Sequence, residues 1–253
     1  MYNNVSFFVC GAPRSGTTYI SDWITESEKA YCVHEVLNEV ENMSYEEVVS
    51  YLRHCASTGK DRYGKLLQRE FLKWNDLHLK EDPQILGIKQ PVTWSGTVNS
   101  PGLIKNVLAK ASVKKIVLLR HPIDVIASGK YRGIHTRNWP NYSVEVHCDL
   151  WITAYRHYVE WTELGNEVHV IFWEELVLDF EAEKNKIEIY LGIDLPNFSG
   201  YEHSASHFSQ LRRSTFRALG VIHNPNRDLL SESEADVIRS KTSEICNNIG
   251  YKI

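Results

Sequence analysis

The first residues that could do chemistry lie near the start of the chain, in the segment GAPRSGTT from Gly11 to Thr18. An apolar run at residues 5–10 precedes this segment, and a pattern typical of a helix follows it. A turn between a strand and a helix leaves backbone N–H groups unpaired, and the helix dipole adds positive potential at the same point. The segment therefore predicts a binding site for phosphate or a similar oxyanion, in which Gly11 and Gly16 shape the turn.

The position of the cation decides between two kinds of phosphate site. The glycine spacing matches a Walker A loop, GxxxxGK[ST], but Thr17 stands where that loop has its lysine. The cation is Arg14, whose guanidinium can bind two oxygens of a terminal phosphate or of a group in transfer. The loop is thus poorly suited to a magnesium nucleoside triphosphate. It suits a nucleotide 5′-phosphate whose leaving charge is neutralised by a protein cation.

Two motifs resemble the nucleotide-binding motifs of one enzyme family. The segment PRSGTT, which starts at Pro13, resembles the 5′-phosphosulfate loop of sulfotransferases that use 3′-phosphoadenosine 5′-phosphosulfate (PAPS). The segment KKIVLLRHPIDVIAS, residues 114–128, resembles the family's 3′-phosphate motif, a strand followed by Arg-x-Pro-x-Asp-x-x-x-Ser. The resemblance covers most of the chain, although residues 44–82 match no segment we can name. It implies a P-loop-type α/β fold and the transfer of a sulfuryl group from PAPS, which leaves 3′,5′-ADP.

The resemblance also implies roles for the residues of both motifs. Arg120 and Ser128 would bind the 3′-phosphate, and Arg14 would stabilise the leaving 5′-phosphate and the sulfuryl oxygens. Backbone N–H groups of the loop would bind the 5′-phosphate, helped by two threonine hydroxyls. These loop residues are Ser15, Gly16, Thr17 and Thr18.

Sulfuryl transfer needs cations at the leaving oxygen, an acceptor held in line, and a base that takes the acceptor's proton. Glu35 is the expected base, because its segment HEVLNE resembles one in carbohydrate-type and bacterial sulfotransferases. His34 is a rival for this role and is otherwise expected to support the substrate side. Lys89 resembles a family position that contacts the sulfuryl group from the side opposite the loop. Because arginine and lysine supply the charge, no metal is expected.

Aromatic and late basic residues complete the expected nucleotide site. Trp173 stands where relatives often carry a tyrosine that contacts adenine, and Tyr19 is a second candidate for the adenine face. Cytosolic members of the family close the 3′-phosphate site with an RKGxxG motif, which this chain lacks. The basic residues that could replace it are Arg212, Arg213, Arg217 and Arg227, and the sequence does not decide among them.

The elements that must position these residues predict a single α/β domain over residues 1–253. Short runs rich in valine, isoleucine and leucine predict buried parallel strands at residues 5–10, 85–89, 115–120 and 168–172. Helical patterns lie between and after them, at residues 17–26, 45–56, 63–79, 101–111, 123–133, 143–164, 180–191 and 232–247. Strands that alternate with helices predict a parallel, doubly wound sheet flanked by helices.

Four of the candidate residues follow, or end, a predicted strand: Arg14, Lys89, Arg120 and Trp173. Ligands of such sheets bind beyond the carboxyl ends of the strands. We therefore expect these side chains to gather on one rim of the sheet.

Composition limits the partners and the compartment that we expect. The net charge of −4 provides no basic field that would favour nucleic acid. The five cysteines form no CxxC pair, which favours a reducing compartment without a zinc site. The first strand starts too early for a signal peptide, and no apolar run approaches about 20 residues. The expectation is a cytoplasmic protein without a nucleic-acid or membrane partner, whose oligomeric state stays open.

The hypothesis is therefore a PAPS-dependent sulfotransferase with a hydroxyl-bearing acceptor, on a carbohydrate or another metabolite, and with a glutamate base. An atypical P-loop kinase is one alternative, although Thr17 in place of the lysine argues against it. A non-catalytic nucleotide-binding protein of the same fold is another.

Overall fold

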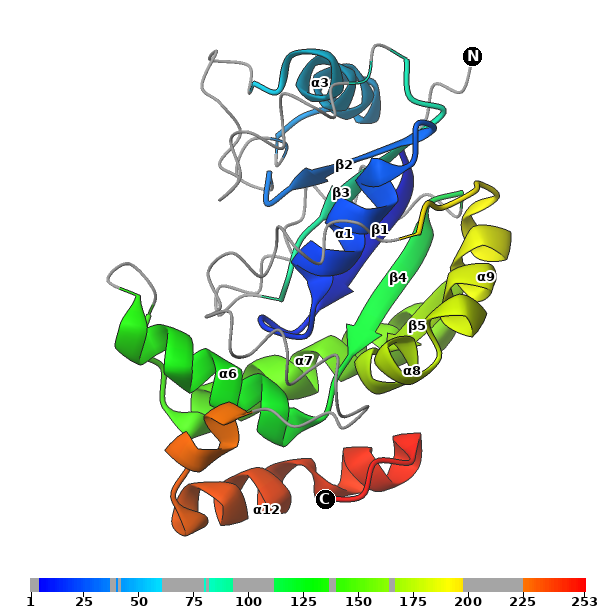
Figure 1. Ribbon diagram of the computed structural model, residues 1–253. Helices are drawn as coiled ribbons and strands as arrows, with labels where there is room; N and C mark the ends of the chain where they lie inside the picture. Colours follow the sequence, from blue (N-terminus) through cyan, green and yellow to red (C-terminus); the bar gives the residue numbers. More distant parts are fainter. Residues whose placement is uncertain are drawn as a thin grey trace.

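The computed structural model describes residues 5–36, 40, 42–60, 80, 82–92, 112–136, 140–163, 167–197 and 225–253 (Figure 1). The helices expected at residues 63–79 and 101–111 lie outside this part of the chain, as do Arg212, Arg213 and Arg217.

The described residues form one parallel sheet of five strands in the order β2-β3-β1-β4-β5. The strands are β1 Val5–Gly11, β2 Ala30–His34, β3 Ile85–Lys89, β4 Lys114–Leu119 and β5 Val168–Phe172. The sheet confirms the α/β fold and the four predicted strands. The sequence analysis missed β2, a strand of five residues with the sequence AYCVH.

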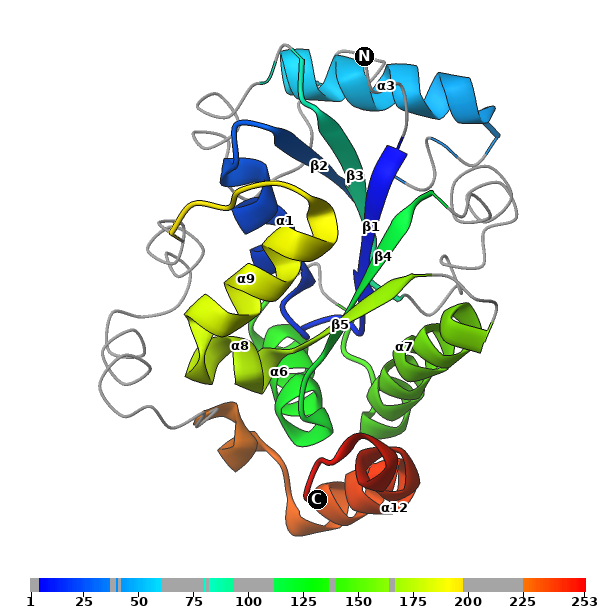
Figure 2. The same ribbon diagram turned by 90° about the vertical axis from the view of Figure 1, so that its right-hand side faces the viewer.

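Helices cover both faces of the sheet. On one face lie α1 Thr17–Glu26, α8 Trp173–Leu178 and α9 Phe180–Leu191, and on the other lie α3 Tyr45–Thr58 and α7 Val144–Glu163 (Figure 2). At the carboxyl ends of the strands, α6 Pro122–His135 packs on α7, on the short 3-10 helix η4 Pro225–Leu229 and on α12 Glu232–Ile249 (Figure 1). The sequence analysis did not predict α8 or η4. None of the helices among the described residues is both long and apolar enough to cross a membrane.

Burial on both faces explains why the central strands could be predicted. In β4, Ile116 and Leu118 point into one core, while Val117 and Leu119 point into the other. A strand that is buried on both sides has no polar face, so it reads as a continuous apolar run. β2 lies at the edge of the sheet, beside β3, and Val33 is its only valine, isoleucine or leucine.

β1 and β4 are parallel neighbours, but the chain continues from them toward opposite edges of the sheet. From β1 it passes through α1 to β2 on one side, whereas from β4 it passes through α6 and α7 to β5 on the other. Because α1 and α7 cover opposite faces, the loops after β1 and β4 diverge at the carboxyl ends of these neighbouring strands. In open α/β sheets such a point is where ligands bind.

Candidate functional site

The loop between β1 and α1 is closed by Ser15. Its backbone N–H and its hydroxyl both donate to the carbonyl of Ala12, at 3.0 and 2.7 Å. Gly16 follows with a φ of 105°, in a left-handed conformation that favours glycine. Ser15 thus holds the turn, with its N–H directed to the loop rather than toward a ligand.

The start of α1 has no side-chain cap among the described residues. Its N-cap residue, Gly16, has no side chain that could accept a backbone N–H, and the first turn contains no acidic residue. By contrast, α3 and α12 begin with complete capping boxes at Ser44 and Ser231. Free N–H groups and an uncompensated dipole at α1 are what an anion-binding helix start requires.

The two predicted anion motifs touch each other. Arg14, in the first loop, donates from Nε to Ser128 Oγ in α6 at 3.3 Å. The carbonyl of Arg14 accepts a hydrogen bond from Arg120 at 3.3 Å. Residues more than 100 positions apart in the sequence therefore meet beyond the carboxyl ends of the neighbouring strands β1 and β4.

Arg120 is held by its backbone and by its side chain. Its carbonyl accepts a hydrogen bond from Trp151 Nε1 at 2.8 Å, and its guanidinium carbon lies 5.5 Å from the Trp173 ring centre. Burial lowers the pKa of Arg120, and the negative charges of Asp124 and Glu174 oppose that effect. The buried Nε of Arg120 has no hydrogen-bond partner among the described residues. A buried charged donor of this kind fits an incoming anion.

Trp173 lies behind the loop. It is only 8% exposed, and a Cβ on Gly16 would come within 2.5 Å of its ring. The edge of Tyr19 meets the same ring, with centroids 5.2 Å apart. Trp173 directly follows β5, as expected from the sequence, and is the first residue of α8. Tyr19, which is half-buried, is the more accessible aromatic of the pair.

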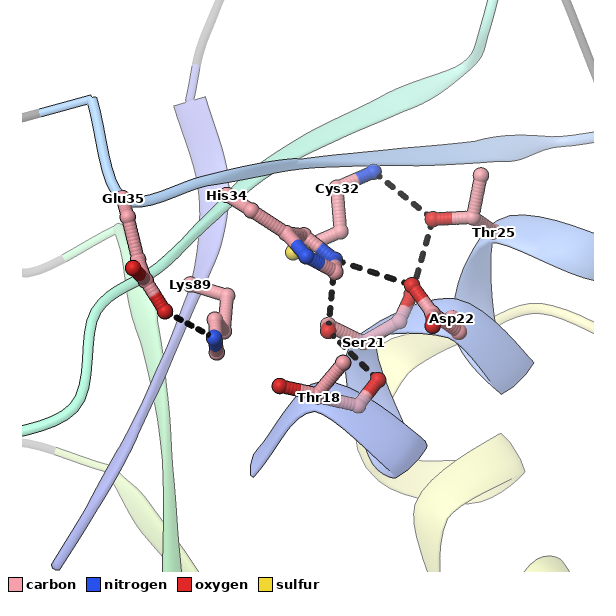
Figure 3. A network of polar contacts seen from close by, with 8 residues as sticks. All are labelled: Thr18, Ser21, Asp22, Thr25, Cys32, His34, Glu35 and Lys89. Carbon is pink, nitrogen blue, oxygen red and sulfur yellow. Dashed lines mark hydrogen bonds and ion pairs between the residues drawn. The ribbon is translucent and has the colours of Figure 1, made fainter. Parts of the chain in front are cut away.

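Glu35 and Lys89 form an ion pair at the ends of β2 and β3. The Lys89 ammonium lies 2.5 Å from Glu35 Oε1, and the Glu35 N–H donates to the carbonyl of Lys89 at 2.8 Å (Figure 3). Lys89 is 2% exposed, whereas the Glu35 side chain is 56% exposed. Burial alone would raise the pKa of Glu35, but the positive charge and hydrogen bond of Lys89, with a smaller effect of His34, lower it. The carboxylate is therefore ionised at neutral pH.

Backbone geometry separates two residues from the rest of the described chain. Arg14, with φ 76°, and Glu35, with φ 55°, are its only non-glycine residues in the left-handed region. This conformation costs an L-residue about 1–2 kcal/mol, and such strain concentrates at functional sites. Both residues were predicted from the sequence, Arg14 from its place in the anion-binding loop and Glu35 from the resemblance of its segment to family members.

His34 turns away from Glu35 and ties β2 to α1. Its Nε2 lies 2.8 Å from Ser21 Oγ and 3.0 Å from Asp22 Oδ1 (Figure 3). Because the Ser21 hydroxyl already donates to the carbonyl of Thr18, it accepts from His34, so Nε2 carries a proton. The bonds connect the strand that precedes Glu35 with the helix that follows the loop. Only the pairing of β2 could have revealed this network.

Arg227 is the one late basic candidate within the described residues. Its guanidinium donates from Nε to Asp124 Oδ1 at 2.5 Å and from a terminal nitrogen to Oδ2 at 2.9 Å. Asp124 is fully buried at the start of α6. Arg227 therefore links η4 to α6 through this buried carboxylate.

Taken together, the strand ends present three cations and one carboxylate: Arg14, Arg120, Lys89 and Glu35. This set can hold anionic groups and accept a proton. Among the described residues, no group of three or more histidine, cysteine or acidic side chains could hold a metal ion.

Comparisons with known proteins are consistent with this arrangement. A family model described as "Sulfotransferase family" matches residues 6–197. The sequence matches no curated protein significantly.

Several solved structures share the fold over nearly the whole chain. The sulfotransferase domain of the Synechococcus PCC 7002 olefin synthase is 16% identical with a TM-score of 0.55, covering 99% of this chain and 96% of that one. The sulfotransferase domain from the curacin biosynthetic pathway is 17% identical with a TM-score of 0.56, covering 99% of both chains. Mouse sulfotransferase SULT7A1 complexed with PAP is 17% identical with a TM-score of 0.52, covering 96% of this chain and 84% of that one.

Proposed function

This chain belongs to the sulfotransferase family, and we propose that it transfers the sulfuryl group of PAPS to a hydroxyl on a carbohydrate or another metabolite. The family supports sulfuryl transfer as the reaction. PAPS as the donor and a hydroxyl as the acceptor are our proposal.

The contact between the two anion motifs carries the proposal for the donor. PAPS has phosphate groups at both ends of its ribose, so its site needs two anion-binding regions a few ångströms apart. Arg14 bonds to both elements of the second motif, through Ser128 and Arg120. The mouse structure contains PAP, which is what remains of PAPS after sulfuryl transfer.

In this proposal, bound PAPS supplies the sulfuryl group and an adenosine 3′,5′-bisphosphate leaving group. The N–H groups at the start of α1 and the hydroxyls of Thr17 and Thr18 bind the 5′-phosphate. Arg120 and Ser128 bind the 3′-phosphate, Arg120 through the Nε that has no partner within the described part of the chain. Arg14 neutralises the charge that develops on the leaving oxygen, after exchanging its bond to Ser128 for one to the nucleotide.

The two aromatic residues near the loop have different proposed roles. Trp173, at 8% exposure, supports the loop and the Arg120 guanidinium. Tyr19 is the side chain that we assign to the adenine face.

Glu35 is proposed as the base that takes the acceptor's proton, and Lys89 as the cation on the sulfuryl oxygens. The ion pair couples these roles. While Lys89 is bonded to Glu35, it lowers the pKa of the carboxyl group and weakens it as a base. When the ammonium shifts toward a sulfuryl oxygen, Glu35 loses that stabilisation and becomes the stronger base.

The test is transfer of labelled sulfate from PAPS to a panel of carbohydrate and small hydroxylic acceptors. Product formation that Arg14→Ala and Glu35→Ala both abolish would support the donor and the residue roles. Undiminished transfer by either variant would refute its role. Turnover of magnesium ATP would favour a kinase. Binding of 3′,5′-ADP in calorimetry without transfer to any acceptor would favour a non-catalytic nucleotide-binding protein.

A further inference from the structure

The last residues of the chain lie against the segment that joins β4 to α6, although the family match ends at residue 197. The Tyr251 hydroxyl donates to Glu174 Oε2 at 2.5 Å, and Glu174 Oε1 accepts the backbone N–H of His121 at 2.8 Å. The Tyr251 and His121 rings meet edge to face with centroids 5.4 Å apart. His121 Nε2 also donates to the carbonyl of Lys252 at 3.0 Å. The C-terminal tail therefore reaches this segment through three contacts.

The path of the tail is fixed by the end of α12. Gly250 adopts a φ of 83° after the helix, and the N–H of Tyr251 bonds to the carbonyl of Cys246 at 2.9 Å. This is a left-handed helix cap, which sets the direction of the residue that follows it. Tyr251 thus enters the contact from a defined backbone position.

These contacts fix the orientation of the peptide bond between Arg120 and His121. The N–H of His121 and the carbonyl of Arg120 belong to the same planar unit. Glu174 binds its N–H edge, and Trp151 Nε1 binds its carbonyl edge at 2.8 Å. Because both edges are held, the plane cannot rotate, and the direction in which the Arg120 side chain leaves the backbone is set.

We propose that Tyr251 and Glu174 are positioning residues, which hold Arg120 in the orientation that recognises a 3′-phosphate. The C-terminal tail thereby sets the preference for nucleotides that carry this group. This inference rests on the proposed function, because it takes Arg120 to be the 3′-phosphate ligand.

The electrostatics agree with this role. Burial and the adjacent Glu174 carboxylate raise the pKa of Tyr251, so its hydroxyl stays a donor. The Glu174 charge also raises the pKa of Arg120 against the effect of burial. The carboxylate therefore helps to keep the guanidinium charged while its two oxygens stay bonded to Tyr251 and His121.

The test compares two nucleotides that differ only in the 3′-phosphate. Dissociation constants of 3′,5′-ADP and 5′-AMP are measured by calorimetry for the wild-type chain and for Tyr251→Phe. Loss of a hydrogen bond to a charged group is expected to weaken 3′,5′-ADP binding about tenfold. Binding of 5′-AMP should change less than about twofold, since it lacks the group that Arg120 would bind. In the transfer assay the KM for PAPS should rise while kcat is maintained.

Two further variants separate positioning from folding. Deletion of residues 251–253 removes the hydroxyl, the ring and the Lys252 carbonyl, so it should reduce the same preference further. Tyr190→Phe is the matched control, because the Tyr190 hydroxyl is buried and bonds to the backbone of Lys115 at the opposite end of β4. It should lower the melting temperature without changing the ratio of the two dissociation constants.

Equal weakening of both nucleotides by Tyr251→Phe, or an unchanged ratio in both tail variants, would overturn the inference alone. A wild-type chain with no preference for 3′,5′-ADP over 5′-AMP would overturn the proposed 3′-phosphate site itself, and this inference with it.

Discussion

Arg14 and Glu35 combine a chemically useful side chain with a backbone conformation that costs free energy. Neither residue is a glycine, yet both have positive φ. Substitution by glycine removes this cost, whereas substitution by alanine keeps it. The side chain's contribution to function and the backbone's cost to stability can therefore be measured at the same position.

At Arg14, the alanine and glycine variants should lose activity equally but differ in stability. Both remove the guanidinium, so kcat for sulfuryl transfer is expected to fall about 10²–10³-fold in each. Arg14→Gly should be more stable than Arg14→Ala by about 1 kcal/mol, because φ is 76° at this residue. Urea unfolding gives the stability difference. A glycine variant that retains most of the activity would remove Arg14 from the mechanism.

At Glu35, the pH dependence of kcat/KM reports the ionisation of the proposed base. Because Lys89 lowers the pKa of Glu35 despite the effect of burial, the acid limb should lie below the pH at which an ordinary glutamate titrates. In Lys89→Met the ammonium is lost but the effect of burial remains, so the pKa of Glu35 should rise. The acid limb of the remaining activity should therefore move to higher pH. An acid limb at the same pH in both proteins would contradict the coupling.

The same shift predicts how the ion pair acts on stability. A carboxyl group with a lowered pKa in the folded state stabilises the fold above its unfolded pKa, and this stabilisation is lost as the pH falls through the folded value. Glu35→Gln should therefore be less stable than the wild-type chain at pH 7. The difference in the free energy of unfolding should disappear in acid.

At the scale of elements, the loop between β1 and α1 depends on a close approach. Gly16 has a positive φ, and its Cα faces the ring of Trp173. The positive φ favours glycine, and the contact with Trp173 leaves no room for a Cβ. The loop therefore couples the start of α1 to the start of α8, which follows a different strand.

Gly16→Ala should disturb this loop, whereas Gly192→Ala is its matched control. Both glycines have positive φ, but an added Cβ would come within 2.5 Å of Trp173 at Gly16, whereas at Gly192 it would meet no described residue within 4 Å. Gly192→Ala should cost about 1 kcal/mol and leave binding of 3′,5′-ADP unchanged. Gly16→Ala should cost about 1–3 kcal/mol more and weaken that binding. Equal behaviour of the two variants in unfolding and calorimetry would contradict the role of this packing.

At the scale of the whole molecule, residues beyond the family match complete the rim. Arg227 brings η4 to the buried Asp124, and Tyr251 brings the end of the chain to Glu174. Asp124 belongs to the predicted 3′-phosphate motif, so the C-terminal part supports the motif through both contacts. Arg227, the late basic candidate within the described residues, thus links η4 to this motif.

Arg227→Ala should destabilise the fold because it leaves a fully buried carboxylate without its main partner. The expected loss is about 2 kcal/mol, since removing a partner exposes the cost of an unpaired buried charge. Arg239→Ala is the control: both arginine side chains are 42% exposed, but the carboxylates that bind Arg239 are on the surface. Its loss should change the free energy of unfolding little, because ion pairs at the surface contribute little to stability. Thermal and urea unfolding distinguish the two, and similar losses would refute the assignment.

Local sequence determined both anion motifs and the strands that carry them. Their signals are complete within a few residues, because a buried strand, a glycine turn and a helix start each depend on neighbours in the chain. Residues 5–10 and the loop to Thr18 are such a unit, as is the run that ends in Arg120. The edge strand β2 has a weaker signal than β5 at the opposite edge, because Val33 is its only valine, isoleucine or leucine, whereas β5 contains two valines and an isoleucine.

Only the tertiary structure decided which of these units meet. The pairing of His34 with Lys89 places Glu35 beside the Lys89 ammonium, 54 residues along the chain. Because β1 and β4 are neighbours in the sheet, Arg120 reaches the carbonyl of Arg14, which is 106 residues away. The tertiary structure also packs Trp173 against Gly16 in the loop between β1 and α1, and it brings Tyr251 to Glu174, 77 residues apart. Such contacts arise from strand order and register, which depend on the packing of the whole chain and leave no periodic mark in the sequence.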